Sequence, residues 1–183
     1  PNEEDISKEG AYSWVKSPRY DGLPMEVGPL ARMYMTGIYN KGISAMDRTI
    51  ARVLEAGKIC GIMEKLLERM EAKEATQKVY DIPDISKGAG LIDTTRGALG
   101  HWISIEDKKI KNYDIITPTA WNLSPKDKNG VLGTMEKALV NTWIENVKNP
   151  IELGRIARTF DPCVSCATHV ISDSINPLEI RII

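Results

Sequence analysis

Apolar and small residues recur every three or four positions between Ile43 and Met70, and charged residues mostly occupy the other positions. This period predicts one long amphipathic helix of roughly 30 residues with a buried apolar stripe, fading before Tyr80. The stripe consists of Ile43, Met46, Ile50, Val53, Gly57, Cys60, Met63, Leu67 and Met70. Such a helix would be about 45 Å long, which suits a scaffold better than a site. Because Cys60 lies on the stripe, we expect it to be a small buried side chain of the core.

Shorter helical patterns flank the long one. A short helix is expected within Glu26 to Tyr39 and another over Leu132 to Val147. A third should begin with Asn149 as its N-cap and Pro150 at its first position. The first 25 residues are rich in turn formers, so we expect no regular structure there, although their aromatic side chains should pack against the rest.

The pattern changes between Gly88 and Trp121. Ile103 and Ile105 alternate with other residues, and Asp107 to Lys109 is typical of a turn. Ile110 to Ile116 would then form the returning strand of a small antiparallel hairpin. The sequence therefore predicts an α+β fold dominated by long core helices, with a small antiparallel β-hairpin region.

Composition narrows the class of protein. The 183 residues are 42% hydrophobic and carry a formal net charge of −1, which fits a globular chain and argues against nucleic acid as the main partner. No apolar run is long enough to span a membrane, and no signal peptide opens the chain. Three cysteines are too few, and odd in number, for a disulfide framework.

Two of these cysteines form the most informative cluster in the chain, at Cys163 and Cys166, with His169 three positions further on. A Cys-x-x-Cys spacing lets two thiolates converge on one metal ion, and thiolates favour zinc, nickel or iron. Taken alone, the pair could equally be a redox dithiol, although it follows a predicted helix instead of opening one after a strand. The remaining ligands of a four-coordinate site would have to come from outside this chain.

The ending Asp-Pro-Cys-x-x-Cys-x-x-His at residues 161–169 resembles the C-terminal signature of the large subunit of nickel–iron hydrogenases, which interconvert dihydrogen with protons and electrons. Four further stretches resemble the same family and occur in its order. They are Ser13 to Tyr20, Met25 to Arg32, Arg96 to Trp102, and Pro118 to Asn122. The resemblance spans nearly the whole chain and implies the fold of a hydrogenase large subunit.

The resemblance also implies roles for single residues. Cys163 matches a terminal nickel ligand, and Cys166 matches a ligand that bridges nickel to an iron carrying carbon monoxide and cyanide. Arg96 matches an arginine above the metals, and Asp161 matches the carboxylate that orients it. Thr119 matches a hydroxyl that donates to a cyanide. Nickel and iron are thus the implied cofactors, and this segment alone need hold none of them.

The end of the chain carries a second set of implied roles. His169 matches a residue that helps bind a structural magnesium-type ion, and the backbone carbonyl of Ile115 falls where the family reaches the same ion. In the family, a maturation endopeptidase cleaves after this histidine, here between His169 and Val170. Residues 1–169 are therefore expected to be the C-terminal portion of a large subunit, and residues 170–183 an extension that is removed.

The sequence departs from the family in ways that define its partners. The family's first cysteine pair and its proton-transfer glutamate lie in an N-terminal half that this sequence lacks, and Thr95 stands where proline is common. The implied partners are that N-terminal half, an iron–sulfur small subunit and the endopeptidase, with no nucleic acid. This segment alone should be inactive. It carries no targeting signal, and we expect it to be cytoplasmic as a precursor and membrane-associated or exported with the small subunit.

Two other functions are compatible with parts of the pattern. One is a non-catalytic relative of the kind found in quinone-reducing respiratory complexes, against which the retained Cys163 and Cys166 argue. The other is a zinc-binding interaction module that uses Cys163, Cys166 and His169.

Overall fold

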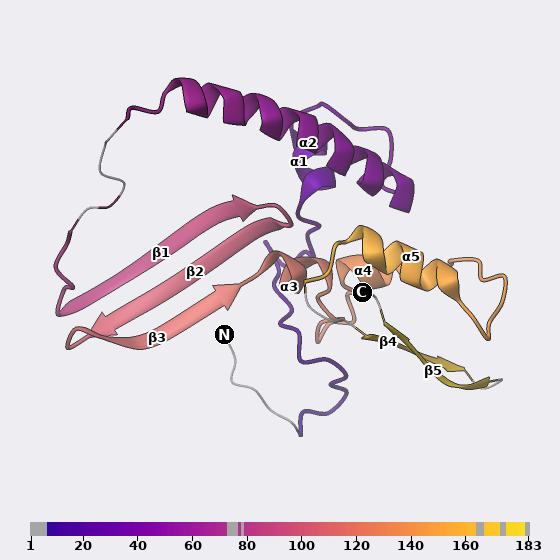
Figure 1. The fold of residues 1–183 in the computed structure, drawn as a ribbon. Coiled ribbons are helices and arrows are strands. Elements are labelled where there is room, and N and C mark those ends of the chain that lie inside the picture. Colours follow the sequence, from indigo (N-terminus) through magenta and orange to yellow (C-terminus); the bar gives the residue numbers. More distant parts are fainter. Residues whose placement is uncertain (1–6, 73–76, 78, 164–166, 173–174, 182–183) are drawn as a thin grey trace.

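The computed structural model describes residues 7–72, 77, 79–163, 167–172 and 175–181, and of residues 167–181 only the backbone. Its elements, in chain order, are α1 (Pro29–Met35), α2 (Ala45–Glu68), β1 (Ile85–Thr94), β2 (Gly97–Glu106), β3 (Lys109–Ile116), α3 (Pro118–Asn122), α4 (Thr134–Leu139), α5 (Ile151–Thr159), β4 (Ala167–Ser172) and β5 (Ile175–Arg181). Figure 1 shows α2 above the sheet β1–β2–β3, with the short helices α3, α4 and α5 gathered beside it. The α+β class is confirmed, but dominance by helices is not, because α2 is the one long helix among the described residues.

The long helix begins at a capping box that the apolar pattern did not reveal. The backbone N–H of Asp47 donates to Ser44 Oγ at 3.2 Å, and the backbone N–H of Ser44 donates to the Asp47 carboxylate at 2.7 Å. Hydrogen bonds from Ser44 and then from Tyr39 lower the pKa of Asp47. The helix has 24 residues and ends at Glu68, several residues short of the prediction.

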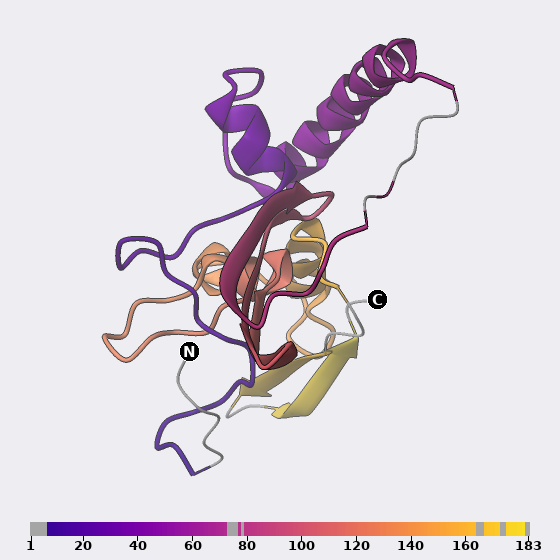
Figure 2. The ribbon, with the colours of Figure 1, turned by 90° about the vertical axis from the view of Figure 1, so that its left-hand side faces the viewer.

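On α2 the predicted apolar stripe is exposed, and two charged side chains are buried instead. Its buried residues are Arg48, Ala51 and Glu55, while Met63 and Leu67 of the apolar stripe are 56% and 65% exposed. Cys60 is exposed as well, so its expected place in the core is wrong for this chain. Figure 2 shows the C-terminal half of α2 projecting beyond the other described elements, so the apolar face of that half has no cover.

The sheet is larger than the predicted hairpin. Strand β1 pairs antiparallel with β2, and β2 pairs with β3. The expected turn is present at Asp107 and Lys108, whose φ angles of 53° and 58° suit a two-residue hairpin turn. Strand β1 was missed because most of its side chains are exposed, so the sequence shows no alternation of buried and exposed positions there.

The shorter helices lie where the sequence predicts them, but their bounds differ from the prediction. Helix α4 ends at Leu139, where Val140 is extended and Asn141 has a φ of 62°, so the predicted helix to Val147 is wrong. Helix α5 is capped by Pro150, one residue later than expected. The buried apolar cluster is small and lies between α1 and α2, at Leu30, Met33, Tyr39 and Ala51. Among the described residues, no helix is both long enough and apolar enough to cross a membrane.

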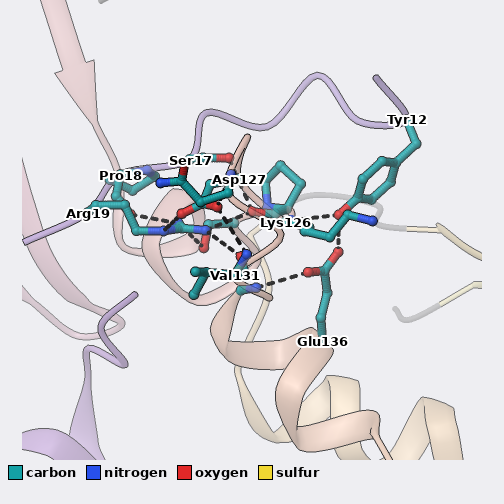
Figure 3. A network of polar contacts seen from close by, with 12 residues as sticks. Tyr12, Ser17, Pro18, Arg19, Lys126, Asp127, Val131 and Glu136 are labelled. Carbon is teal, nitrogen blue, oxygen red and sulfur yellow. Dashed lines mark hydrogen bonds and ion pairs between the residues drawn. The ribbon is translucent and has the colours of Figure 1, made fainter. Parts of the chain in front are cut away.

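The N-terminal segment lies along the loop after α3 and is held there by polar contacts (Figure 3). Arg19 donates from Nη1 to Ser124 Oγ at 3.1 Å and from Nη2 to the carbonyls of Pro125 and Val131 at 3.0 and 3.2 Å. Its Nε lies 3.4 Å from Asp127 Oδ2. The segment is irregular, as expected, but hydrogen bonds hold it more than aromatic packing does, because Trp14, Tyr12 and Tyr20 remain exposed.

Candidate functional site

The candidate site begins at the turn between β1 and β2. Thr94 pairs with Gly97, which leaves Thr95 and Arg96 as a two-residue hairpin loop. Gly97 has a φ of 131°, a conformation that side chains with a Cβ rarely adopt. The strands thus present the Arg96 side chain at the end of the sheet, where it is 44% exposed.

Asp161 faces this turn from the end of α5. The Nε of Arg96 donates to the backbone carbonyl of Asp161 at 3.1 Å and lies 3.4 Å from its carboxylate Oδ2. Asp161 itself has a φ of 50°, so the chain turns sharply after α5. This contact between residues 65 positions apart agrees with the predicted pairing of Arg96 and Asp161.

Cys163 and Thr119 complete the group. The backbone N–H of Cys163 donates to Thr119 Oγ1 at 3.2 Å, and the Cys163 side chain is exposed. Thr119 lies in the first turn of α3, which begins because the Thr117 hydroxyl accepts from the Ala120 N–H and Pro118 occupies its first position. Four of the predicted site residues therefore meet where the sheet, α3 and the end of α5 come together.

The segment Glu26 to Gly28 joins the surrounding elements. Val27 exchanges two hydrogen bonds of 2.9 Å with the side-chain amide of Asn122, which is only 3% exposed. The Glu26 carboxylate accepts from Arg48 of α2 at 2.8 and 2.7 Å. These bonds bring α2 and α3 against one short segment, which also packs against the Arg96 turn at Gly28. Arg96 and Asp161 line a small hollow beside it.

Helix α2 also holds the chain that leads to Asp161. The Arg48 guanidinium lies 4.0 Å above the centre of the Phe160 ring, an attractive cation–π arrangement. Arg52 donates to the carbonyl of Thr159 at 2.9 Å. The buried charged face of α2 therefore supports the last residues of α5, directly before the predicted ligand Cys163.

The other predicted site residues are not joined to this group by the described contacts. Ile115 lies on β3 opposite His101, whose Nδ1 is 2.6 Å from the hydroxyl of Tyr113. Cys166 lies outside the described residues. His169 and Val170 lie on β4, with backbones paired to Glu179 and Leu178 of β5. Their roles remain predictions.

Sequence reasoning missed the arginine that supports the turn. Arg32 of α1 binds Glu55 on α2, and that hydrogen bond is the main reason that the pKa of Arg32 is raised. Asn122 was also missed as a support. Both residues end stretches that resemble the hydrogenase family, and that position in a motif is the signal that could have revealed them.

The described group can supply part of a metal centre. It offers one thiol, a guanidinium with several N–H donors and a hydroxyl, which suits a soft metal ion carrying anionic ligands. No three histidine, cysteine or acidic side chains converge as a metal site within the part of the chain that the structure describes. The group therefore fits a centre whose other ligands come from elsewhere.

Comparisons with known proteins identify the family. The sequence profile of the family described as nickel-dependent hydrogenase matches residues 1–42 and 36–169. The uptake hydrogenase large subunit of Rhodobacter capsulatus is 35% identical over 97% of this chain. The periplasmic [NiFeSe] hydrogenase large subunit of Desulfomicrobium baculatum is 36% identical over 90%.

Solved structures give the same result. The Ni-Fe-Se hydrogenase from D. vulgaris Hildenborough superposes with a TM-score of 0.81 at 36% identity, over 86% of this chain and 38% of that one. The chain spans 35% and 37% of the two large subunits named above. By sequence and by fold, the chain belongs to the nickel-dependent hydrogenase family and corresponds to part of its large subunit.

Proposed function

We propose that this chain is the C-terminal part of the large, catalytic subunit of a nickel–iron hydrogenase, which interconverts dihydrogen with protons and electrons. The observation that carries the proposal is the meeting of Cys163 and Thr119 with the Arg96–Asp161 pair, in a chain of this family. These residues come from three parts of the fold, namely the β1–β2 turn, α3 and the segment after α5, and the family resemblance had assigned all of them to one centre.

Each residue of the group has a chemical task in the proposal. Cys163 and Cys166 would hold nickel, and Cys166 would also reach the iron. When bound, the metal pair would supply a Lewis-acidic position at which dihydrogen could be polarised. Arg96 and Thr119 have N–H and O–H donors suited to anionic ligands such as cyanide, and Asp161 restrains the arginine from its Nε side. A structural magnesium-type ion would use His169 and the carbonyl of Ile115.

The proposal includes the rest of the large subunit, with the first cysteine pair, as a necessary partner. Two observations support it: the chain spans 35% to 38% of its relatives, and the apolar stripe on α2 is exposed. A contiguous exposed stripe of this kind is typical of a surface that another part of the protein covers. An iron–sulfur small subunit would carry the electrons.

We also propose that residues 170–183 are removed by a maturation endopeptidase. The family profile matches through residue 169, which supports a boundary there. Intact mass of the chain, produced with and without hydrogenase maturation enzymes, tests this step. Loss of residues 170–183 in the first sample alone is expected, and an unchanged mass in both would contradict it.

Export or membrane association together with the small subunit is the proposed location of the mature protein. One relative is named a periplasmic hydrogenase, which supports this location. Fractionation of cells that express the chain with its small subunit tests it, and a mature protein found wholly in the cytoplasm would contradict it.

Hydrogen-dependent dye reduction tests the function itself. The assembled enzyme, with the whole large subunit and the small subunit, should reduce a viologen dye under hydrogen, and Cys163→Ser should lower the rate at least about a hundredfold because a metal ligand itself is lost. Cys60→Ser is the matched control and should keep the rate. The 183-residue chain alone should be inactive. An active Cys163→Ser enzyme would contradict the proposal.

A further inference from the structure

Arg32 is the most heavily bonded side chain near the site. A guanidinium carries five N–H donors, and the structure gives Arg32 five hydrogen bonds. Two of them run side by side to the Glu55 carboxylate, from Nε at 2.5 Å and from Nη2 at 2.7 Å. Glu55 is buried on α2, so this bidentate pair fixes the plane and the direction of the guanidinium.

The remaining three donors hold the turn that carries Arg96. Nη1 donates to the Asp93 carboxylate at 2.6 Å and to the carbonyl of Thr94 at 2.9 Å, and Nη2 donates to the carbonyl of Thr95 at 3.0 Å. These are the three residues directly before Arg96. One rigid group, anchored on α2, therefore sets the backbone that leads into Arg96.

The opposite side of the same turn is held by close packing. A Cβ at Gly28 would lie 2.7 Å from the carbonyl oxygen of Arg96, and a Cβ at Gly97 would lie 2.6 Å from Val27 Cγ2. Contacts this short exclude larger residues unless the backbone moves. The turn is thus fixed from two sides, by the Arg32 donors at residues 93–95 and by the 27–28 segment at residues 96–97.

We propose that Arg32 is a positioning residue, which acts with Glu55 to hold the Thr94–Thr95 backbone so that the Arg96 guanidinium stays beside Asp161. The inference rests on the proposed function, in which Arg96 lies above the metals. Arg96 is half exposed and is held by Asp161 through Nε, so its direction depends on the turn backbone. Lysine at position 32 would keep the charge but could not bind a carboxylate with two donors and two carbonyls at once.

The first test measures the turn and needs no enzyme activity. Hydrogen–deuterium exchange of the purified chain, read by mass spectrometry, should be about tenfold faster at residues 94–97 in Arg32→Lys. The reason is the loss of the hydrogen bonds from the guanidinium to the carbonyls of Thr94 and Thr95. Arg19→Lys is the matched control, since Arg19 also makes five contacts, four of them to the 124–131 loop. It should speed exchange at residues 124–131 and leave residues 94–97 unchanged. Unchanged exchange at 94–97 in Arg32→Lys would overturn the proposal.

The second test separates positioning from general support. In the assembled enzyme, Arg32→Lys should lower kcat about tenfold with an unchanged KM for the dye, and it should cost nothing further in an Arg96→Lys background. A merely structural arginine would lower the rate by the same factor in both backgrounds, and that result would overturn the proposal. If Arg32→Lys fails to fold, Glu55→Gln takes its place in both tests, with the same direction and a smaller change expected.

The two tests also separate this inference from the proposed function. If the unmodified enzyme shows no hydrogen-dependent activity, the proposed function fails, and the exchange measurement still decides whether Arg32 holds the turn. If activity is present but exchange at residues 94–97 does not respond to Arg32→Lys, only the positioning inference fails.

Discussion

The two halves of α2 differ in which side chains they bury. In the N-terminal half the buried side chains are Arg48, Ala51 and Glu55, and both charged residues have bidentate partners. In the C-terminal half the side chains are exposed and include Met63 and Leu67. Within this chain, then, polar bonds of defined geometry hold the helix to the candidate site. The apolar surface is left for a partner, which we propose is the rest of the large subunit.

The largest expected effect comes from removing the buried ion pair between Glu55 of α2 and Arg32. Glu55→Leu would take away the buried carboxylate that Arg32 binds with two donors and leave it only the exposed Asp93, and losing one partner of a buried ion pair typically costs about 3 kcal/mol of unfolding free energy. Urea unfolding of the chain measures it. Glu64→Leu, at an exposed position on the same helix, should change stability by less than about 0.5 kcal/mol. Equal effects at the two positions would remove the distinction between the halves.

The second largest loss of stability should come from removing the two hydrogen bonds between Asn122 and Val27. Asn122→Ala leaves the N–H and the carbonyl of Val27 without their partners, which should cost about 2 kcal/mol because both groups lie beside a buried side chain. Asn129→Ala, in the exposed loop after α3, is the control for the same unfolding measurement. A loss below about 0.5 kcal/mol at Asn122 would show that the Glu26 to Gly28 segment does not join the elements as described.

Substitutions in the exposed apolar stripe of the C-terminal half of α2 should leave stability unchanged and affect assembly instead. Leu67→Lys and Met63→Lys should leave the unfolding free energy of the chain within about 0.5 kcal/mol, since both side chains are already exposed. The same changes should block assembly with the rest of the large subunit, measured by co-purification. Lys65→Ala is an exposed control that should assemble normally. Normal assembly of both lysine variants would show that the stripe is not the contact surface.

The smallest effect is the loss of stability at acid pH that comes from Asp127 in the loop after α3. The backbone N–H of Val131, followed by that of Asn129, donates to Asp127 and lowers its pKa in the folded chain. A lowered folded pKa stabilises the fold above the ordinary aspartate range, and this contribution disappears as pH falls through the folded pKa. Unfolding measured from pH 6 down to pH 2 should therefore show a smaller acid loss for Asp127→Asn than for the unchanged chain. An identical acid loss would contradict this.

The sequence predicted the position of helices better than the burial of their side chains, because burial depends on partners that are distant in the sequence. The periodicity placed α2 because a helix repeats whether or not its stripe is covered. It could not show that Arg48 and Glu55 face inward, since charged residues are ordinarily on the surface and their partners Glu26 and Arg32 lie 22 and 23 positions away. Strand β1 was missed because neither a buried face nor a regular alternation marks it.

The candidate site was predicted by resemblance more than by pattern. Arg96 and Asp161 alone would more often form a structural ion pair, and only the hydrogenase-like motifs placed them with Cys163 and Thr119. The structure brings these residues together, and their roles stay predictions. Arg32 could not be assigned from sequence, because its role depends on carbonyls of the backbone at Thr94 and Thr95.

Nickel content is the most direct test of the central claim that Cys163 belongs to the metal centre. Elemental analysis of the assembled enzyme should find nickel in stoichiometric amount in the unchanged protein and in Cys60→Ser, and almost none in Cys163→Ser. Full nickel in Cys163→Ser, or an equal loss in Cys60→Ser, would contradict the account.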